Sequence, residues 1–515
     1  MKIVSALTRI VAGAGVIVAL AGLPPAEAQD NAAARAAREW RLSHEWQIID
    51  EYYGFLRIPN VSRDLPNVRR NADYLLKMME KRGIKSRLLE VSGAPPAVYG
   101  EILTPGATHT YVFYSHYDGQ PLDPKEWATP PFEPVLRSAR LDKGGQLVPF
   151  PAQGQRFDPD WRIYARSASD AKAAIFSMLT AVDALNAAGM KPRANIKFIF
   201  EGEEELESPN LGRILNANKE LLKGDLWFIC DGPEHPSGNQ TINFGARGIQ
   251  KMEVTVYGAK RQLHSGHYGN WAPNPALMLA QLLASMKDAD GRVLVENFYD
   301  GVVALSDLEK KAIAATPDDD AALMQEMGLA RTDGGGRKLG ELINLPSLNI
   351  RGMASARIGE QAANVIPAAA TAAIDLRLVK GVTNKGQVAR VIEHIRKQGY
   401  FVVATEPDDK TRLAHPRIAK VVVSADGYNA VRTPMDLPVA QNVIATVSTV
   451  RRPVVLNPTS GGSSPWDMIT DELGTNIISI STVNYDNNQH SSNENLRLQN
   501  LWNGLETHAA LIMME

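Results

Sequence analysis

Residues 196–208 join a hydrophobic strand directly to a run of carboxylates, and this stretch constrains the fold more than any other. Large apolar side chains stand at every second position of residues 196–200, which predicts a buried strand. Gly202 interrupts the pattern, and glutamates follow at positions 203–205. In open α/β sheets, ligands bind just beyond the carboxyl ends of the strands. Because carboxylates gathered there repel one another, a divalent cation is the expected partner; the alternative is a solvated acidic loop.

Segments with strand character alternate with segments of helical periodicity along the chain. Strands are predicted at residues 98–103, 110–115, 161–166, 196–200, 225–230 and 476–483. Helices are predicted at residues 31–57, 64–82, 209–222, 418–430 and 496–513. Another helix is predicted to follow Lys172, with one apolar face formed by Ile175, Met178, Leu179, Val182 and Leu185. This alternation indicates an α/β fold in which helices flank a mostly parallel sheet. A Pro- and Gly-rich loop is expected between residues 120 and 160. A second loop is expected to hold Ser460-Gly461-Gly462-Ser463.

The character of the sequence changes near Phe244 and changes back near residue 412. Strands are predicted at residues 249–257, 370–379 and 400–405, and helices at 275–286 and 385–398, with polar helices and loops between 287 and 345. We therefore expect residues 245–411 to form an inserted α+β domain. Residues 29–244 and 412–515 then form one domain in two parts.

The first 28 residues resemble a cleavable signal peptide. Lys2 and Arg9 precede an apolar run at residues 10–23, which is too short for an ordinary membrane-spanning helix. Ala26-Glu27-Ala28 offers small residues for cleavage before Gln29. The sequence predicts a periplasmic or secreted protein with no stable membrane span after cleavage; the alternative is an uncleaved anchor.

Charge and cysteine content narrow the range of partners. The formal net charge of -2 gives no general preference for nucleic acid or anionic membranes, so no nucleic-acid partner is expected. Cys230 is the single cysteine, which excludes an intrachain disulfide.

Potential metal ligands recur where predicted strands end or loops begin. A single His after a strand is usually a hydrogen-bonded polar residue, and a single Asp is usually a helix N-cap. The recurrence makes a metal site the better interpretation, and imidazole with carboxylate suits zinc or another first-row ion. The positions are His116 with Asp118, Asp170, Glu204 with Glu205, Asp231, and His490.

The order and spacing of these motifs resemble those of the M20 metallopeptidases, the carboxypeptidase G2 and carnosinase-like group of zinc hydrolases. The resemblance extends over nearly the whole mature chain. The matching segments are Ser115-His116-Tyr117-Asp118, Arg166-Ser167-Ala168-Ser169-Asp170-Ala171-Lys172, Glu201-Gly202-Glu203-Glu204-Glu205, Asp231, and His490-Ser491-Ser492-Asn493-Glu494.

The resemblance implies a centre of two Zn²⁺ ions per chain, with Co²⁺ or Mn²⁺ as possible substitutes. His116 and Asp231 would bind one ion, Glu205 and His490 the other, and Asp170 would bridge both.

It also implies how water is activated at that centre. Asp118 would orient the ring of His116, as metal-bound histidines usually require. Glu204 would be the general base, taking a proton from the water and later delivering it to the leaving amine.

The inserted domain resembles the lid and dimerisation domain of the same family, which implies a homodimer. His264 would stabilise an oxyanion, often in the partner's site, and Arg377 would pair with a substrate carboxylate. The alternatives are an interface hydrogen bond for His264 and a surface salt bridge for Arg377. Further substrate contacts are implied for Asn364, Gly462 and Ser463.

The sequence departs from the family pattern at several positions. Ala171 stands where a second Asp is usual, which would weaken the support of the metal ligands. Ser167, Ala173 and Glu207 replace glycines that allow tight turns.

Together these features predict an exported zinc exopeptidase, a dipeptidase or carboxypeptidase, that hydrolyses an amide bond next to a free carboxylate. An N-acyl-amino-acid deacylase is the alternative within the same chemistry. The alternative outside enzymes is a non-catalytic relative that binds peptides. Ala171 is the only residue that motivates this alternative. The preferred side chains and the native metal stay open.

Overall fold

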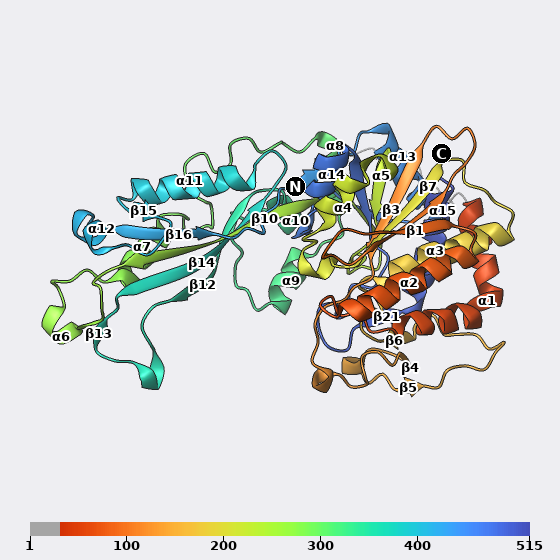
Figure 1. The fold of residues 1–515 in the computed structure, drawn as a ribbon, viewed down its shortest axis with the longest axis horizontal. Coiled ribbons are helices and arrows are strands. Elements are labelled where there is room, and N and C mark those ends of the chain that lie inside the picture. Colours follow the sequence, from red (N-terminus) through yellow and green to blue (C-terminus); the bar gives the residue numbers. More distant parts are fainter. Residues whose placement is uncertain (1–30) are drawn as a thin grey trace, which may run out of the picture.

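A mixed sheet of eight strands forms the centre of the first module in the computed structural model, which describes residues 31–515 (Figure 1). Its strands are β1 (Lys85–Leu89), β2 (Ala97–Ile102), β3 (Thr110–His116), β7 (Asn195–Glu201), β8 (Leu226–Ile229), β9 (Gln240–Asn243), β18 (Val454–Asn457) and β20 (Asn476–Ile480). Their order is β1-β2-β7-β3-β8-β20-β9-β18. The central pairs from β7 to β20 are parallel, whereas β1 and β2 add antiparallel strands at one edge. The predicted α/β fold is confirmed.

Helices cover both faces of this sheet. One face carries α1 (Ala32–Leu56), α2 (Leu65–Lys81), α3 (Lys172–Ala187), α13 (Pro438–Val450) and α15 (Leu498–Ile512), whose apolar side chains join the larger core. The other face carries α4 (Leu211–Ala217), α5 (Lys219–Leu222) and α14 (Asp467–Leu473). The single helix predicted at residues 209–222 is therefore two, separated at Asn218. Asp64 caps α2 as its sequence predicts, accepting a hydrogen bond from the Asn67 backbone N–H.

A small four-stranded sheet connects two distant parts of the chain. It contains β4 (Val135–Arg137), β5 (Leu147–Val148), β6 (Arg162–Tyr164) and β21 (Asn495–Arg497). Two of these strands lie in the segment predicted as a loop between 120 and 160. Pairing of β21 with β6 places the chain just after His490 beside the chain just before Asp170.

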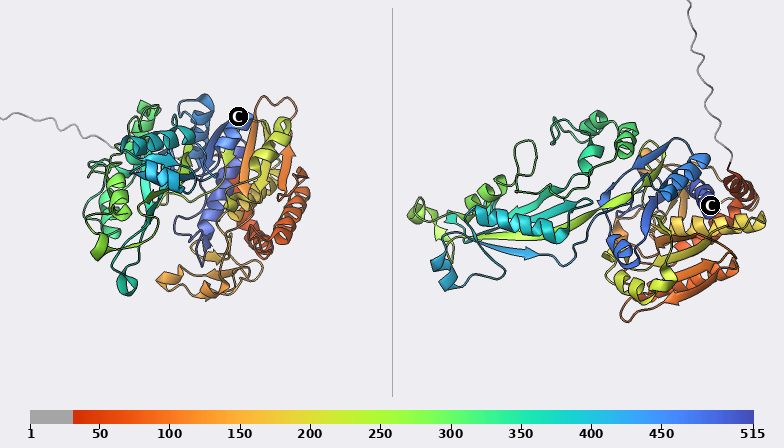
Figure 2. Two further views of the ribbon diagram at one scale, coloured as in Figure 1. Left: turned by 60° about the vertical axis from the view of Figure 1, so that its left-hand side comes forward. Right: turned by 90° about the horizontal axis from the view of Figure 1, so that it is seen from above.

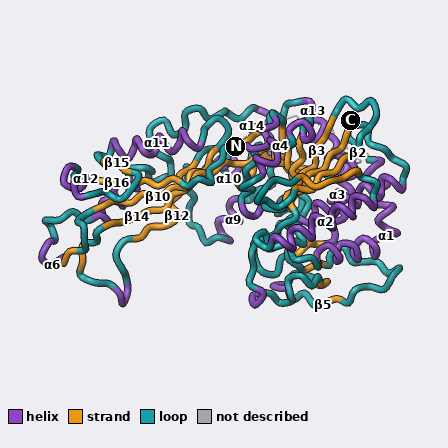
Figure 3. The backbone as a smooth tube through the Cα atoms, viewed as in Figure 1, coloured by secondary structure: helices purple, strands orange, loops and turns teal. Residues whose placement is uncertain are grey.

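The second module is built around β10 (Gly245–Tyr257), which runs from one module into the other (Figures 1 and 2). Its sheet continues with β12 (Ser347–Ala354), β14 (Ala369–Leu378), β15 (Phe401–Val403) and β16 (Ile418–Val423). Helices α7 (Pro275–Ala284) and α11 (Asn384–Lys397) pack against it. Loops and short elements form the outer end (Figure 3), including β11 (Leu263–His264), α6 (Ser265–Tyr268), β13 (Val365–Ile366) and α12 (Asp409–Ala414).

Two predictions of local structure are wrong. Residues 418–430 do not form a helix, because β16 pairs with β10 along residues 418–423. The β-branched run Val421–Val423 favours a strand, and the pairing places this strand of the second sheet beyond residue 411. Residues 460–463 are not a loop but form β19 (Ser460–Ser463), which with β17 (Val431–Arg432) pairs with the start of β10.

The polar segment between β10 and β12 returns to the first module. It contains α8 (Asp307–Ala315), α9 (Asp320–Glu326) and α10 (Leu339–Ile343), which agrees with the predicted mixture of helices and loops. Arg432 and Glu309, both almost fully buried, lie 3.3 Å apart and anchor α8, while Ala312 packs against the core of the first module. The segment therefore crosses the junction between the modules.

The predicted signal peptide, residues 1–28, lies outside the described residues. Among the helices that the structure does describe, from residue 31 onward, none has both the length and the hydropathy needed to cross a bilayer.

Candidate metal centre and active site

Three neighbouring strands deliver acidic and imidazole side chains to one edge of the central sheet. β3 ends at His116, β8 is followed by Asp231, and β7 leads into the single turn Glu204–Leu206. Because β3 is parallel to both β7 and β8, the carboxyl ends of all three strands meet. This is the edge at which the sequence predicts a cation site.

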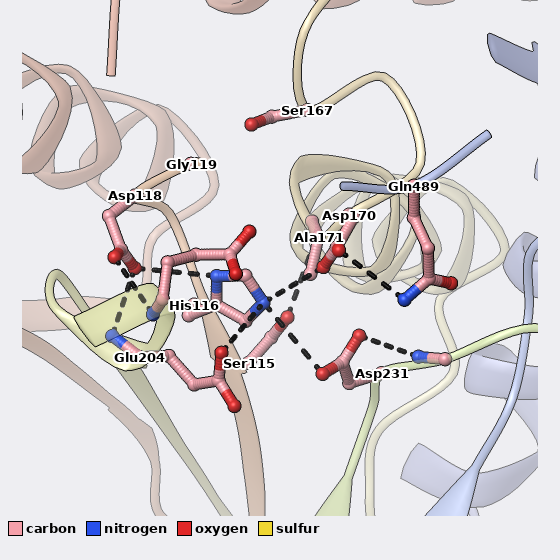
Figure 4. A network of polar contacts seen from close by, with 12 residues as sticks. Ser115, His116, Asp118, Gly119, Ser167, Asp170, Ala171, Glu204, Asp231 and Gln489 are labelled. Atoms are coloured by element: carbon pink, nitrogen blue, oxygen red, sulfur yellow. Dashed lines mark hydrogen bonds and ion pairs between the residues drawn. The ribbon is translucent and has the colours of Figure 1, made fainter. Parts of the chain in front are cut away.

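Asp170 lies between two histidines. Its Oδ1 is 3.1 Å from Nε2 of His116, and its Oδ2 is 3.1 Å from Nε2 of His490. Figure 4 shows the side chains of Asp170 and Asp231 directed toward His116. One carboxylate therefore faces two imidazoles through different oxygens.

Two groups of side chains share Asp170 and have the donor atoms that a metal ion requires. One group adds His116 and Asp231, the other adds Glu205 and His490, and the donor atoms of each group lie within 4.8 Å of one another. Imidazole and carboxylate donors without thiolate suit zinc and similar divalent ions. The residues present thus fit two neighbouring ions.

Asp118 contacts both His116 and the turn that carries Glu204 and Glu205. Its Oδ1 is 3.3 Å from Nδ1 of His116, the ring nitrogen turned away from Asp170. The same carboxylate accepts hydrogen bonds from the backbone N–H groups of Glu204, at 3.2 Å, and Glu205, at 3.1 Å. Asp118 is fully buried, so it fixes both the imidazole and the glutamate turn (Figure 4).

Glu204 enters the cavity beside the two groups but belongs to neither. Its Oε2 lies 3.8 Å from Nε2 of His116, and its side chain is about one-fifth exposed, at 19%. Burial, followed by the charges of Asp231 and Glu205, raises the pKa of Glu204 well above its usual value despite the nearby His116.

Burial also raises the pKa of two of the candidate ligands. For Asp231 and Glu205, the next cause is the charge of Asp170. Burial alone would raise the pKa of Asp170 too, but hydrogen bonds from His116 and His490 lower it below the usual range. Carboxylates crowded in this way create a site in which a cation is strongly favoured.

Glu494 supports Asp170, a role that the sequence reasoning did not assign to it. Its buried carboxylate accepts hydrogen bonds from the backbone N–H groups of Ser167, Ser169 and Asp170, from the hydroxyl of Ser169, and from Arg166. Ala171 is fully buried and offers no carboxylate. Support for Asp170 therefore comes from Glu494, which belongs to the same motif as His490.

Two glutamines also reach the candidate ligands. Nε2 of Gln120 donates to Oε2 of Glu205 at 2.7 Å, and Nε2 of Gln489 lies 3.5 Å from Oδ2 of Asp170. Sequence reasoning missed both, although Gln120 follows Asp118 by two positions and Gln489 directly precedes a candidate ligand.

Two of the residues that replace the family's glycines adopt a backbone conformation that glycine favours. Ser167 has φ of 61° and Glu207 has φ of 66°, both in the left-handed region. Ser167 is held by Asn60 and Glu494, and Glu207 forms an ion pair with Lys251. Local contacts thus secure conformations that glycine adopts freely.

A cavity of about 540 Å³ opens beside the candidate ligands. Gly462 and Ser463 line it together with Asp170, Glu204 and His490. Arg377 stands just behind this wall, where its Nη1 donates to Oγ of Ser463 at 2.6 Å. Gly462 and Ser463 therefore share one cavity with the candidate metal centre, and Arg377 contacts this wall through Ser463 without lining the cavity.

Arg247 is a second cation at this wall that sequence reasoning missed. It is almost fully buried and lies opposite Ser463 in the pairing of β10 with β19. Burial and the neighbouring Arg377 lower the pKa of its guanidinium to about 10. Two adjacent arginines form an environment that suits a carboxylate.

His264 and Asn364 are not brought to this cavity. His264 caps α6 at the outer end of the second module (Figure 1), and Asn364 accepts a hydrogen bond from the Ser265 backbone N–H at 2.9 Å. Neither residue lines the cavity. Within this chain both residues lie near the short β11–β13 pairing rather than at the cavity.

The profile of one known family, Peptidase family M20/M25/M40, matches residues 112–514. This match covers well over half of the chain, so the chain belongs to that peptidase family. It is therefore a hydrolase that acts on peptide bonds, as the resemblance implied.

Relatives and a solved structure agree with this assignment. The chain is 26% identical to the Cys-Gly metallodipeptidase DUG1 of Candida albicans, over 90% of this chain and 93% of the relative. It is 25% identical to the human Beta-Ala-His dipeptidase, over 81% of this chain and 77% of the relative. An M20 family metallo-carboxypeptidase from Sulfolobus solfataricus, Sso-CP2, superimposes with a TM-score of 0.71 at 25% identity, covering 91% of this chain and 98% of that structure.

Proposed function

We propose that this protein is a di-zinc exopeptidase of the dipeptidase type, which hydrolyses the amide bond next to a free carboxylate. The observation that carries the proposal is the placement of Asp170, whose two oxygens face His116 and His490 in two groups of potential ligands. The names of the relatives, a Cys-Gly metallodipeptidase and a Beta-Ala-His dipeptidase, support a dipeptide substrate.

The proposed ligands are His116 and Asp231 for one ion, Glu205 and His490 for the other, and Asp170 for both. Bound zinc would supply a water of lowered pKa and polarise the carbonyl that is attacked. Asp118 keeps the His116 ring in place by contacting its other nitrogen.

Glu204 is the proposed general base. It lies beside both groups of ligands without belonging to either, and it lines the cavity. Its carboxylate accepts the proton of the attacking water and then delivers that proton to the amine that leaves. The neighbouring Glu205 differs in role because Gln120 and His490 hold its side chain.

Arg377 and Arg247 are proposed to attract the substrate carboxylate. Arg377 is oriented by Ser463, and Arg247 is held by the backbone carbonyl of Leu345 at 2.9 Å. A planar guanidinium pairs well with a carboxylate through two parallel hydrogen bonds. Gly462 leaves room beside them, because nothing lies within 4 Å of the position where its Cβ would stand.

We further propose a homodimer formed through the second module. β12 is an edge strand whose unpaired side is open, and exposed apolar side chains gather there and at the outer end: Ile350, Met353, Ile358 and Trp271. An open apolar edge favours pairing with another chain. His264 and Asn364 would then serve the partner's active site rather than that of their own chain.

Export is proposed from the pattern of residues 1–28 alone. Its test is the N-terminal sequence of the mature protein recovered from the cell envelope or medium, which should begin near Gln29. A protein that keeps residues 1–28 in the membrane fraction would indicate an anchor instead.

The central test combines metal analysis with hydrolysis of a dipeptide panel before and after chelation. About two zinc ions per chain are expected, with activity lost on chelation and restored by Zn²⁺. Absence of bound metal, with no gain when metal is added, would overturn the ligand assignment.

A further inference from the structure

The segment that crosses back from the second module forms one wall of the active-site cavity. Ile313 from α8, Leu339 and Ile343 from α10, and Asp318 from the loop before α9 all line it. Ile343 lies against Gly461, since a Cβ at that glycine would be 3.4 Å from Cδ1 of the isoleucine. The wall is therefore apolar except for Asp318 and a few small polar groups.

Asp318 is held at this wall by a histidine of the first module. Nε2 of His235 lies 2.9 Å from Oδ1 of Asp318, and Nδ1 of His235 lies 2.8 Å from Oγ of Ser237. Both Asp318 and His235 line the cavity, and the carboxylate is about one-third exposed, at 36%. Part of this side chain is therefore accessible to a molecule in the cavity.

The charges around Asp318 favour a cation. Among the described residues, no lysine or arginine lines the cavity. Asp170 and Asp231 are proposed metal ligands, and Glu204 is the proposed general base. Glu234 is buried against Arg451 and Asn500. Asp318 is therefore the remaining carboxylate of the lining, and it contacts the imidazole of His235.

The reach from the metal centre to Asp318 suits a short peptide. His235, the partner of Asp318, follows the candidate ligand Asp231 by four residues, a span of at most about 14 Å in fully extended chain. A peptide whose scissile carbonyl lies at the metal centre reaches about 3.5–7 Å with one or two residues on its amino side, a distance that lies within this limit.

We propose that Asp318, positioned by His235, binds the free N-terminal ammonium group of the peptide substrate. This inference rests on the proposed peptidase function and deepens it, because it names the end of the substrate that is recognised. An N-acylated substrate carries no cation, so binding it removes water from Asp318 without giving the carboxylate a partner. The structure then favours peptides with a free amino terminus over N-acyl amino acids.

The test compares Asp318→Asn with Asp319→Asn in the full-length zinc-loaded protein. Both variants remove one negative charge, and Asn can replace Asp at 319, where the side chain caps α9 through the Ala322 N–H. Asn at 318 can still bond His235, which keeps the wall in place. The substrates are an alanine dipeptide, an alanine tripeptide and the N-acetylated form of each; slow substrates are measured as inhibitors.

For Asp318→Asn we expect kcat/KM to fall about 10- to 100-fold with a free-amine peptide, mainly through KM, as for a lost charge-assisted hydrogen bond. The N-acetylated forms should change by less than about threefold, and Asp319→Asn should leave all substrates unchanged. Whether the dipeptide or the tripeptide shows the larger effect indicates the length that fits.

Three results would overturn the inference. An equal loss of kcat/KM for free and acetylated substrates would show that Asp318 has a structural role. An unchanged kcat/KM for both would show that Asp318 does not bind the substrate. Full zinc content without hydrolysis of any of the four substrates by the unaltered protein would reject the proposed function itself, and this inference with it.

Discussion

Oε1 of Glu494 accepts a hydrogen bond of 2.9 Å from the backbone N–H of Asp170, the residue that faces both histidines of the candidate metal centre. The same carboxylate pairs with Arg166, and both side chains are almost completely buried. A single side chain from the last motif thus fixes the loop that carries the proposed bridging ligand.

Glu494→Gln should weaken both the fold and metal binding. The amide places N–H groups against backbone donors and leaves Arg166 without its charge partner, and breaking a buried pair costs about 3–5 kcal/mol. Metal affinity should fall about 10- to 100-fold because Asp170 loses its support. Chemical unfolding and zinc titration measure the two effects. Glu220→Gln, at a side chain 83% exposed, is the control that should change neither, and equal behaviour of both variants would contradict the role of Glu494.

Glu204→Gln should remove turnover and keep the metal. Loss of a general base lowers kcat by about 10²- to 10⁴-fold, while the proposed ligands stay in place. Dipeptide hydrolysis and zinc content per chain test this. Glu207→Gln changes a nearby glutamate whose carboxylate instead pairs with Lys251, so it should stay active. Loss of zinc in the Glu204 variant would make Glu204 a ligand rather than the base.

Much of this centre was predictable because the relevant residues follow strands whose apolar alternation is clear in the sequence. His116, Asp231 and the glutamates at 204 and 205 meet because the parallel order of β7, β3 and β8 places their carboxyl ends together. The bounds of α1, α2 and β3 also agree closely with prediction, because helix-capping residues and the periodicity of apolar side chains are strong local signals.

Contacts over long sequence separations were not predictable in the same way. Glu494 and Asp170 are 324 positions apart, and no local pattern links Asp318 to His235. The helix predicted from residue 418 is wrong because Ile418–Val423 form a strand through pairing with β10. Such pairing depends on tertiary context, which the local sequence does not reveal. His264 fits the family motif but lies at the outer end of the second module and does not line the cavity of its own chain, a placement that the motif alone does not reveal.

Arg377→Lys should raise KM more than it lowers kcat. Lysine keeps the positive charge but loses the planar fork that Ser463 orients, so carboxylate binding should weaken about tenfold. Steady-state kinetics with a dipeptide and with its C-terminal amide separate the two effects, because the amide lacks the charged group. Arg396→Lys, on the exposed face of α11, is the matched control. An equal loss for the dipeptide and its amide would show that Arg377 does not bind the carboxylate.

Mixing two inactive variants should restore activity if His264 acts in the partner's site. His264→Asn can retain the cap that the Gly266 N–H forms with residue 264, while it removes the imidazole. After subunit exchange with Glu204→Gln, half of the dimers are mixed, and each mixed dimer has one intact site, so about a quarter of all sites recover. Each variant incubated alone is the control. No recovery, with exchange verified by labelled subunits, would place the function of His264 elsewhere.

The stability of the fold should fall as the pH drops below 6.5, and His508 should be one cause. Burial lowers the pKa of this histidine from 6.5 to about 3, so the folded protein keeps it neutral while the unfolded chain takes up a proton. Its contribution to the free energy of unfolding is complete above pH 6.5 and is lost progressively as the pH falls from 6.5 toward 3, at up to about 1.4 kcal/mol per pH unit.

The free energy of unfolding, measured from pH 7 to pH 5, should therefore decline less for His508→Asn, which can still contact Ser177 but does not titrate. Other buried groups titrate in both proteins and cancel in the difference, so parallel curves would exclude His508 as a source of the pH dependence.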